Sequence, residues 1–389
     1  MTQDLFTPLS FECEKELERL YGTIKNNHKI EKKFYAWLPK NINDLSLLLT
    51  KDRAMRNSFY LSEPALCSAY LYYFLPWNVY RLCRCNLQNL LCLKENDNII
   101  DMGCGPLTFI FALWIAIPEY RNLNLNFYCI DKNIKIMQTG KKIFKDFSGA
   151  DSKWRITLVP ASFYSGLKVP PAALVGAVNV CNEIFWNINQ ADISALDVAA
   201  EKQAKKLAGL ASANGQIFVA EPGVPRCGQF LNLMRNCFLQ DGLSIKAPCT
   251  HSAPCAAGGG KRGTKWCHFA FDTKGAPKEL VTLSAAAALS KERAAISFLL
   301  AEKKPASPLT SPPLLKTGRV ISDSFPLPSS MRGRYACITE GLALVSGYPD
   351  AIEKYPCGSV LNIQNTVLKE RDPKSGAYII KQKSLLDNG

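Results

Sequence analysis

The sequence has no uninterrupted apolar run of the roughly 18 to 20 residues that a membrane-spanning helix needs. Its start also lacks both the apolar stretch of a signal peptide and the Arg-rich, acid-poor composition of a transit segment. These absences predict a soluble protein that does not contact membranes. We expect it in the cytoplasm, most simply of a bacterium, and as a monomer.

Histidine is scarce and cysteine is abundant, with 3 and 15 residues respectively in a chain of 389. The simplest interpretation of these cysteines is not a secreted disulfide scaffold, because such scaffolds are short and carry an export signal. Most of the cysteines, such as Cys67, Cys83, Cys92, Cys129 and Cys181, lie within apolar patterns. We expect these to be small core residues with reduced thiols.

An apolar fraction of 47% excludes wholesale disorder, and the length suggests two or three domains. Apolar residues at spacings of three and four predict an N-terminal helical domain over 1–95. Strands then alternate with helices, which predicts an α/β domain over 96–303 with a doubly wound parallel sheet and a Cys-rich insertion at 247–270. A Pro-rich connector and a small β-rich module are expected over 304–389.

The net charge of +14 favours a polyanionic partner, because neutralised phosphates release counterions. The alternative is that the basic groups are ordinary solvated faces. Taken together with the total charge, the basic groups favour nucleic acid as the partner. The groups are Lys132, Lys135, Lys141, Lys142 and Lys145; Lys202, Lys205 and Lys206; and Lys261, Arg262 and Lys265.

The segment NIIDMGCGPLTFIFALW predicts a strand, a Gly-rich turn and a helix. We expect Asp101, which ends the strand, to bind the cofactor together with Gly103 and Gly105, which let the backbone approach a ligand closely. Asp131 ends the next predicted strand, where its carboxylate can accept hydrogen bonds from ribose hydroxyls. The pattern suits S-adenosylmethionine as well as a dinucleotide. Since Leu107 and its neighbour replace the third glycine of the dinucleotide motif, S-adenosylmethionine is favoured.

The fourth predicted strand ends in CNEIFWN, which places Asn182 and Glu183 at the carboxyl edge of the sheet as candidate catalytic residues. Helix capping by Asn182 and a salt bridge of Glu183 are the alternatives. The chain has neither an obvious nucleophile nor the Asn-Pro-Pro-Tyr block of many base methyltransferases. Methyl transfer needs little beyond in-line positioning, so this does not exclude catalysis.

Three cysteines cluster in the irregular segment APCTHSAPCAAGGGKRGTKWCHF: Cys249, Cys255 and Cys267, with His251 and His268 beside them. Such a segment allows several thiolates to converge on one centre. Zinc and a 4Fe-4S cluster both suit this donor set, and compact CxxC pairs, the strong zinc signal, are missing. Chance clustering in a Cys-rich chain is the third interpretation.

Several blocks together resemble the small-ribosomal-subunit methyltransferase-like family, which includes mitochondrial ribosome assembly factors and bacterial relatives. The resemblance extends over roughly Pro64 to Val345. It is carried by AYLYYFLPWNVY, DMGCGPLTFIFALW, CNEIFWN, FVAEPGVPRCGQFLNLMR, APCTHSAPC, KWCHF and GRYACITEGLALV.

The resemblance implies a Rossmann-like S-adenosylmethionine-dependent methyltransferase fold and a small ribosomal subunit or its rRNA as partner, with ribosomal proteins as further contacts. It also implies a 4Fe-4S cluster, and a pocket-shaping EPG turn that contains Glu221. Leu107 stands where the family usually has glycine, and we expect it to crowd the cofactor carboxylate. Two functions follow as alternatives: an rRNA methyltransferase, or a non-catalytic rRNA-binding assembly factor with a structural 4Fe-4S or zinc site. The implied cluster ligands are Cys249, Cys255, Cys267 and Cys337.

Overall fold

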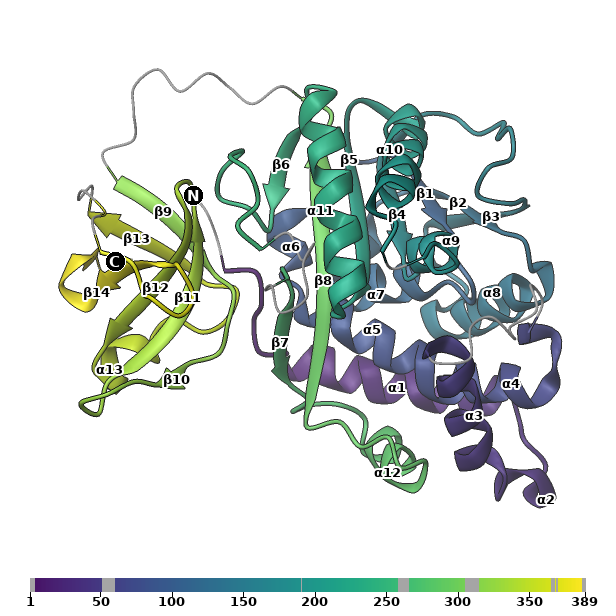
Figure 1. Cartoon of the computed structure of the whole chain (residues 1–389). Helices are drawn as coiled ribbons and strands as arrows, with labels where there is room; N and C mark the ends of the chain where they lie inside the picture. The colour runs from purple at the N-terminus through teal and green to yellow at the C-terminus, as the bar shows by residue number, and fades with distance from the viewer. Residues whose placement is uncertain are drawn as a thin grey trace.

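The computed structural model of the chain describes residues 4–50, 60–189, 191–257, 266–304, 315–364, 368 and 370–386. Most of the predicted Pro-rich connector and the basic group Lys261, Arg262 and Lys265 lie outside these residues. The described residues form an eight-stranded sheet with helices on both faces, and a seven-stranded sheet built from the C-terminal part (Figure 1).

The large sheet confirms the predicted α/β fold. Its first five strands are parallel, whereas the last three pair antiparallel. The strand order reverses between β1 and β4, which creates the switch point where open α/β sheets bind ligands. The order is β3 (Trp154–Pro160), β2 (Leu125–Asp131), β1 (Asn98–Met102), β4 (Ala172–Val178), β5 (Ala211–Pro222), β8 (Arg293–Glu302) and β6 (Ser244–Ala247), with β7 (Phe269–Asp272) also paired to β8.

The two faces of this sheet bury two different cores, because successive side chains of a strand point to opposite sides. Ile99 packs into one buried cluster and Ile100 into the other. The first face is covered by α7 (Thr108–Ala116) and α8 (Ile134–Ser148) together with the N-terminal helices. The second is covered by α9 (Cys181–Phe185), α10 (Ile193–Leu210) and α11 (Pro225–Gln240); α12 (Lys278–Ala286) follows β7.

The N-terminal residues are helical, as predicted, and they share a core with the sheet: Tyr73, Trp77 and Phe109 belong to one buried cluster. A π-helical turn, η3 (Tyr70–Phe74), lies between two α-helical segments just before Pro76. The helices are α1 (Phe11–Asn27), α2 (Lys32–Tyr35), α3 (Leu38–Thr50), α4 (Pro64–Ala69), α5 (Leu75–Arg84) and α6 (Leu87–Leu90).

The C-terminal residues form the expected β-rich module. Its strand β11 (Arg332–Ile338) alternates: Ala336 and Ile338 enter the module's own core, while Tyr335 and Cys337 pack against the core of the large sheet. The other elements are β9 (Leu315–Val320), β10 (Phe325–Pro326), β12 (Gly341–Gly347), α13 (Pro349–Ile352), β13 (Val360–Gln364), β14 (Tyr378–Lys381) and β15 (Leu385–Leu386).

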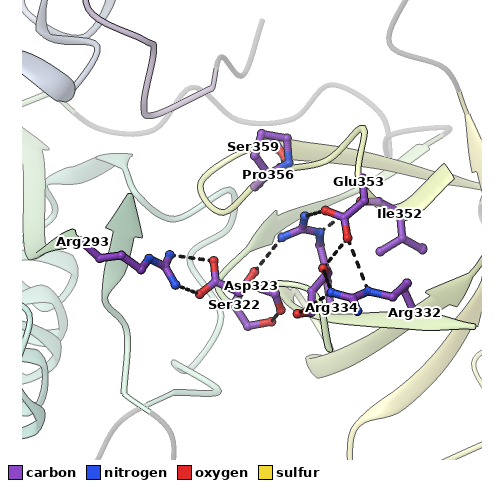
Figure 2. Close-up of polar contacts among 10 residues, drawn as sticks. Arg293, Ser322, Asp323, Arg332, Arg334, Ile352, Glu353, Pro356 and Ser359 are labelled. Atoms are coloured by element: carbon purple, nitrogen blue, oxygen red, sulfur yellow. Dashed lines mark hydrogen bonds and ion pairs between the residues drawn. The ribbon is translucent and has the colours of Figure 1, made fainter. Parts of the chain in front are cut away.

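Polar contacts join this module to the rest of the molecule. The N-terminal segment passes between the two sheets (Figure 1), and the Leu5 amide donates to the Gly358 carbonyl at 3.1 Å. On the other side, Arg293 of β8 forms a two-pronged ion pair with Asp323 of the module (Figure 2). The module is therefore fixed against the edge of the large sheet formed by β6, β7 and β8.

Candidate functional site

A pocket lies at the carboxyl ends of β1, β2 and β4, at the switch point of the sheet. Four residues selected from the sequence line it: Gly103, Gly105, Asp131 and Glu183. The turn after β1, the turn after β2 and the segment after β4 thus meet in one place. The other lining residues are Tyr60, Leu61, Tyr70, Cys104, Thr108, Lys132, Asn133, Val178, Asn179 and Val180.

The Gly-rich turn has left-handed backbone at both glycines, with φ of 68° at Gly103 and 49° at Gly105. A Cβ at Gly103 would lie 2.3 Å from Cγ2 of Val180, so a side chain there has no room. A Cβ at Gly105 would meet no atom within 4 Å, so this glycine borders the open space of the pocket. The turn is tight on one side and leaves the backbone accessible to a ligand on the other.

Leu107 also has left-handed backbone, with φ of 67°. Its side chain is fully buried in the main core and is not among the residues lining the pocket. The expectation that Leu107 crowds a bound cofactor therefore finds no support in the pocket geometry.

Asp131 is held in place by the two turns around it. One carboxylate oxygen accepts from the Gly105 amide at 3.0 Å and the other from the Asn133 amide at 2.8 Å. These backbone donors fix the carboxylate at the end of β2 with one side toward the pocket.

Asp101 lies beneath the pocket rather than in its wall. It is 1% exposed, and its Oδ2 has no hydrogen-bond partner among the described residues. Burial, with a smaller contribution from repulsion by Asp131, raises the pKa of Asp101 to about 8. At neutral pH this carboxyl group is therefore mainly protonated.

Tyr70 is a lining residue that the sequence analysis missed. It lies in the π-helical turn of the N-terminal helices, a feature that often marks functional sites. Burial, followed by the negative charges of Glu183 and Asp131, raises the pKa of its hydroxyl. The aromatic spacing of this segment predicted core packing, and nothing in that spacing distinguishes the one ring that faces a pocket.

The two candidate catalytic residues have different surroundings. Asn182 is 4% exposed, and its side-chain amide donates to Glu221 Oε2 at 2.6 Å; the Cys181 amide donates to Oε1 of the same glutamate at 2.8 Å. Asn182 and Glu221 thus fix the start of α9 behind the pocket wall. Glu183 faces the pocket, with its carboxylate 3.8 Å from the Lys132 ammonium.

The pocket offers backbone amides, carboxylates and a phenol rather than a nucleophile. Cys104 lines the pocket, but the pKa of its thiol is raised well above the ordinary value. Burial is the larger cause, and a hydrogen bond to Cys129 adds to it. A neutral, buried thiol is a poor nucleophile. The arrangement is suited to binding and orienting a polar ligand.

The clustered cysteines lie at a second place, between α11 and the C-terminal module. Cys249, Cys255 and Cys267 line a small cavity together with Arg235 of α11. Cys337 approaches from β11, and its sulfur is 3.4 Å from His251 Nε2. The four cysteines selected from the sequence are thus brought to one region by two separate sheets.

The electrostatics of this region reflect its crowding with sulfur. The pKa values of the Cys255, Cys267 and Cys337 thiols are all raised, mainly by burial and to a smaller degree by repulsion between the cysteines. The pKa of Cys337 is raised to about 12. Among the described residues, no three His, Cys, Asp or Glu side chains have the geometry of a single metal-ion site.

A buried arginine accompanies the cysteines. Arg235 Nε donates to the Cys249 sulfur at 3.2 Å, and its Nη2 donates to the carbonyls of His251 and Ala253. Its Nη1 is buried and has no hydrogen-bond partner in the described part of the chain. An unpaired buried donor beside four thiols is what a site for an anionic group would present.

The remaining cysteines mostly follow the prediction of a core role. Cys83, Cys129 and Cys181 are buried and Cys67 is partly buried, but Cys92 is exposed, so the prediction was wrong there. The Cys92 backbone amide donates a hydrogen bond to the Gln216 side chain at 2.9 Å, so the backbone is tied to β5 while the thiol is exposed.

Comparison with known proteins gives a family and a set of similar folds. The profile of the family described as "Mitochondrial small ribosomal subunit Rsm22" matches residues 95–326, more than half of the chain. No curated protein sequence matches the chain. In the described residues, no helix is both long and apolar enough to cross a bilayer.

Similar solved structures include two that are described as methyltransferases and one that is described as TrmN. A methyltransferase from Pyrococcus furiosus has 10% identity and a TM-score of 0.32, over 56% of this chain and 79% of that one. Precorrin-6y C5,15-methyltransferase from Geobacter metallireducens has 12% identity and a TM-score of 0.32, over 56% and 85%. TrmN from Thermus thermophilus has 11% identity and a TM-score of 0.33, over 59% and 52%.

Proposed function

The chain belongs to the family of the mitochondrial small ribosomal subunit protein Rsm22, as its sequence blocks predicted, and from this premise we propose that it is an S-adenosylmethionine-dependent methyltransferase acting on small-subunit rRNA. One observation carries the proposal: Gly103, Gly105 and Asp131, from two separate turns, line the same pocket at the switch point of the sheet. Open α/β sheets bind their ligands at this location.

The residues present suit S-adenosylmethionine, which supplies an electrophilic methyl group when bound. Gly105 offers open space beside its backbone, and we assign the Asp131 carboxylate, which lines the same pocket, the role of accepting hydrogen bonds from ribose hydroxyls. We assign Asn182 and Glu221 a positioning role, since their hydrogen bond fixes the start of α9. Glu183, at the wall of the pocket, is the candidate to receive a proton from the acceptor nucleotide.

A 4Fe-4S cluster held by Cys249, Cys255, Cys267 and Cys337 is the second part of the proposal. Its support is the convergence of the thiols and the unpaired Nη1 of Arg235, a cation beside a site that would carry net negative charge. Zinc is the alternative centre for the same donor set.

We also propose three structural units, with the boundaries 1–95, 96–303 and 304–389. The family description is mitochondrial, whereas the sequence predicted the cytoplasm, and that prediction and the monomeric state are open to fractionation and sizing experiments.

Calorimetry with S-adenosylmethionine tests the cofactor. The parent should bind, and Asp131→Ala should weaken binding at least tenfold, because a charge-assisted hydrogen bond contributes about 1.5 to 3 kcal/mol. Asp151→Ala, which removes an exposed carboxylate elsewhere, is the matched control. Thermal melting of both variants verifies that they are folded.

Transfer of a labelled methyl group to small-subunit rRNA tests the reaction. Incorporation by the parent and its loss in Asp131→Ala support the enzyme. If the parent does not bind the cofactor, and rRNA binding survives in Asp131→Ala, the chain is instead a non-catalytic assembly factor.

A further inference from the structure

Among the described residues, four arginines are almost completely buried, and the surroundings of Arg235 differ from those of the other three. Arg235 is 3% exposed, and its partners in this part of the chain are the Cys249 sulfur and the carbonyls of His251 and Ala253. None of these partners is a carboxylate. A buried cation without an anion destabilises a fold, so Arg235 requires a negative charge of another kind. The other three each have a carboxylate that stabilises their charge: Asp272 for Arg84, Glu353 for Arg334 (Figure 2) and Asp4 for Arg319.

The Arg235 guanidinium also holds the backbone between two of the cysteines. Its Nη2 donates to the carbonyls of His251 and Ala253 at 3.0 and 2.8 Å, while Nε donates to the Cys249 sulfur at 3.2 Å. Because the guanidinium is planar and rigid, these three bonds fix the sulfur and the two carbonyls relative to one another. The bonded residues lie between Cys249 and Cys255, and both cysteines line the same cavity as Arg235.

The positive charge of Arg235 extends to cysteines that it does not bond. Burial raises the pKa values of Cys255 and Cys337, and the charge of Arg235 partly opposes this rise. The Nη1 atom of Arg235 has no hydrogen-bond partner in the described part of the chain, nor do Asn232 Oδ1, whose residue lines the same cavity, and His251 Nδ1. Buried polar atoms are stabilised when a bound group supplies the partner that the protein does not.

We propose that Arg235 is the counter-ion and the positioning residue of the cysteine-ligated centre. Four thiolates around zinc or around an oxidised 4Fe-4S core leave a net charge of about −2, which compensates the buried guanidinium. In the metal-free protein the same guanidinium has no such compensation, so it should stabilise the loaded form and destabilise the metal-free form. This inference rests on the centre proposed above and applies to either metal.

Two substitutions at this position separate charge from hydrogen bonding. Arg235→Gln removes the charge but keeps an amide donor, whereas Arg235→Lys keeps the charge and loses the planar fork. The matched control is Arg226→Gln, in the first turn of the same helix, where the guanidinium donates to the Asn189 carbonyl at 3.0 Å and not to the cysteine segment.

The first measurement is retention of the metal. The proteins are purified without oxygen, their iron, sulfide and zinc contents are determined, and the rate at which a chelator removes the metal is followed by absorbance. Arg235→Gln should lose its metal at least about tenfold faster than the parent, since partners of the ligands typically contribute 10- to 100-fold to metal affinity. Arg235→Lys should lie between the two, and Arg226→Gln should match the parent. Equally fast loss from the Gln and Lys variants would overturn the counter-ion role.

Thermal unfolding of the loaded and the metal-free proteins gives a readout that a merely structural arginine would not move. Arg235→Gln should melt below the parent in the loaded form, but at or above the temperature of the parent after the metal has been removed, because the uncompensated buried charge is gone. Destabilisation of both forms, or a variant that does not fold in either, would show that the hydrogen bonds of Arg235 matter and its charge does not.

Metal analysis of the parent distinguishes the two levels of the proposal. If the parent contains neither iron nor zinc and takes up neither on reconstitution, the proposed centre fails and this inference fails with it. If the parent holds either metal and Arg235→Gln retains that metal as long as the parent does, the centre stands and only the role of Arg235 is overturned.

Discussion

The pocket at the end of β1, β2 and β4 and the region of the four cysteines depend on different kinds of support. The glycine turn and Asp131 are within thirty residues of each other and are connected by hydrogen bonds such as that from the Gly105 amide to the Asp131 carboxylate. Cys249 follows β6 of the large sheet, and Cys337 lies on β11 of the other sheet. The first site is built around neighbouring strands of one sheet, whereas the second needs segments from both sheets to come together.

We therefore expect that substituting one of the four cysteines destabilises the whole protein more than substituting a pocket residue does. Cys255→Ser removes one proposed cluster ligand and should lower the free energy of unfolding by at least about 4 kcal/mol, because binding of a structural metal centre contributes directly to folding. Iron and sulfide content and urea unfolding, both measured without oxygen, test this. Cys92→Ser, at the exposed cysteine, is the control. A Cys255→Ser protein that keeps its iron and unfolds with the parent would eliminate the cluster.

The same difference explains how much the sequence could predict. A strand, a Gly-rich turn and a helix are local, so the residues 98 to 114 carried both the element types and the position of Gly103 and Gly105 at a pocket. The alternation of strands and helices likewise predicted the parallel part of the sheet. These features depend on chain periodicity and on right-handed crossovers, which a single sequence reveals.

Contacts between distant segments were not accessible in this way. Cys337 was placed with the other cysteines only through a family resemblance, since its position depends on how β11 docks on the large sheet. Tyr70 was missed because its orientation depends on a π-helical turn, which the apolar spacing does not reveal. Cys92 was assigned to the core because its neighbours are apolar, yet Leu91 and Leu93 on either side of it are buried and Cys92 between them is exposed.

Within the pocket, Gly103 and Gly105 allow the stability of the turn and its role in binding to be measured separately. Gly103→Ala should destabilise the fold by roughly 3 kcal/mol, because the new Cβ meets Val180 at 2.3 Å and the backbone is left-handed. Gly105→Ala should cost about 1 to 2 kcal/mol from backbone strain alone, since its Cβ meets nothing within 4 Å. Urea unfolding measures both costs.

Cofactor binding should show a different pattern for these two variants. The methyl group of Gly105→Ala enters the open side of the turn and should weaken S-adenosylmethionine binding even though the fold persists. Unchanged affinity in calorimetry would show that the cofactor does not approach this glycine.

The buried carboxyl group under the pocket predicts a pH dependence. The pKa of Asp101 is raised from 3.8 to about 8 in the folded protein. Between these values the unfolded chain has released a proton that the folded chain retains, so stability falls as pH rises, by at most about 1.4 kcal/mol per pH unit. The loss is complete once pH exceeds the folded pKa.

Asp101→Asn should remove this slope, because the amide has no charge to bury. Urea unfolding between pH 5 and 9 compares it with the parent and with Asp146→Asn, which changes an exposed carboxylate. Parallel curves for Asp101→Asn and the parent would mean that Asp101 is ionised in the folded protein across this range.

The smallest effect is expected for the ion pair that also joins the large sheet to the C-terminal module. Arg293 and Asp323 (Figure 2) link the same two units as the cysteines, but their side chains are 48% and 52% exposed. Solvent screens such pairs, so Arg293→Met should cost less than about 1 kcal/mol, and a double-mutant cycle with Asp323→Asn should give a coupling of the same small size. Comparing this loss of stability with that of Cys255→Ser then shows whether the ion pair or the cysteines contribute more to holding the C-terminal module on the large sheet. A cost of several kcal/mol for Arg293→Met would show instead that polar contacts dock the module, and that the cysteines contribute little to holding it.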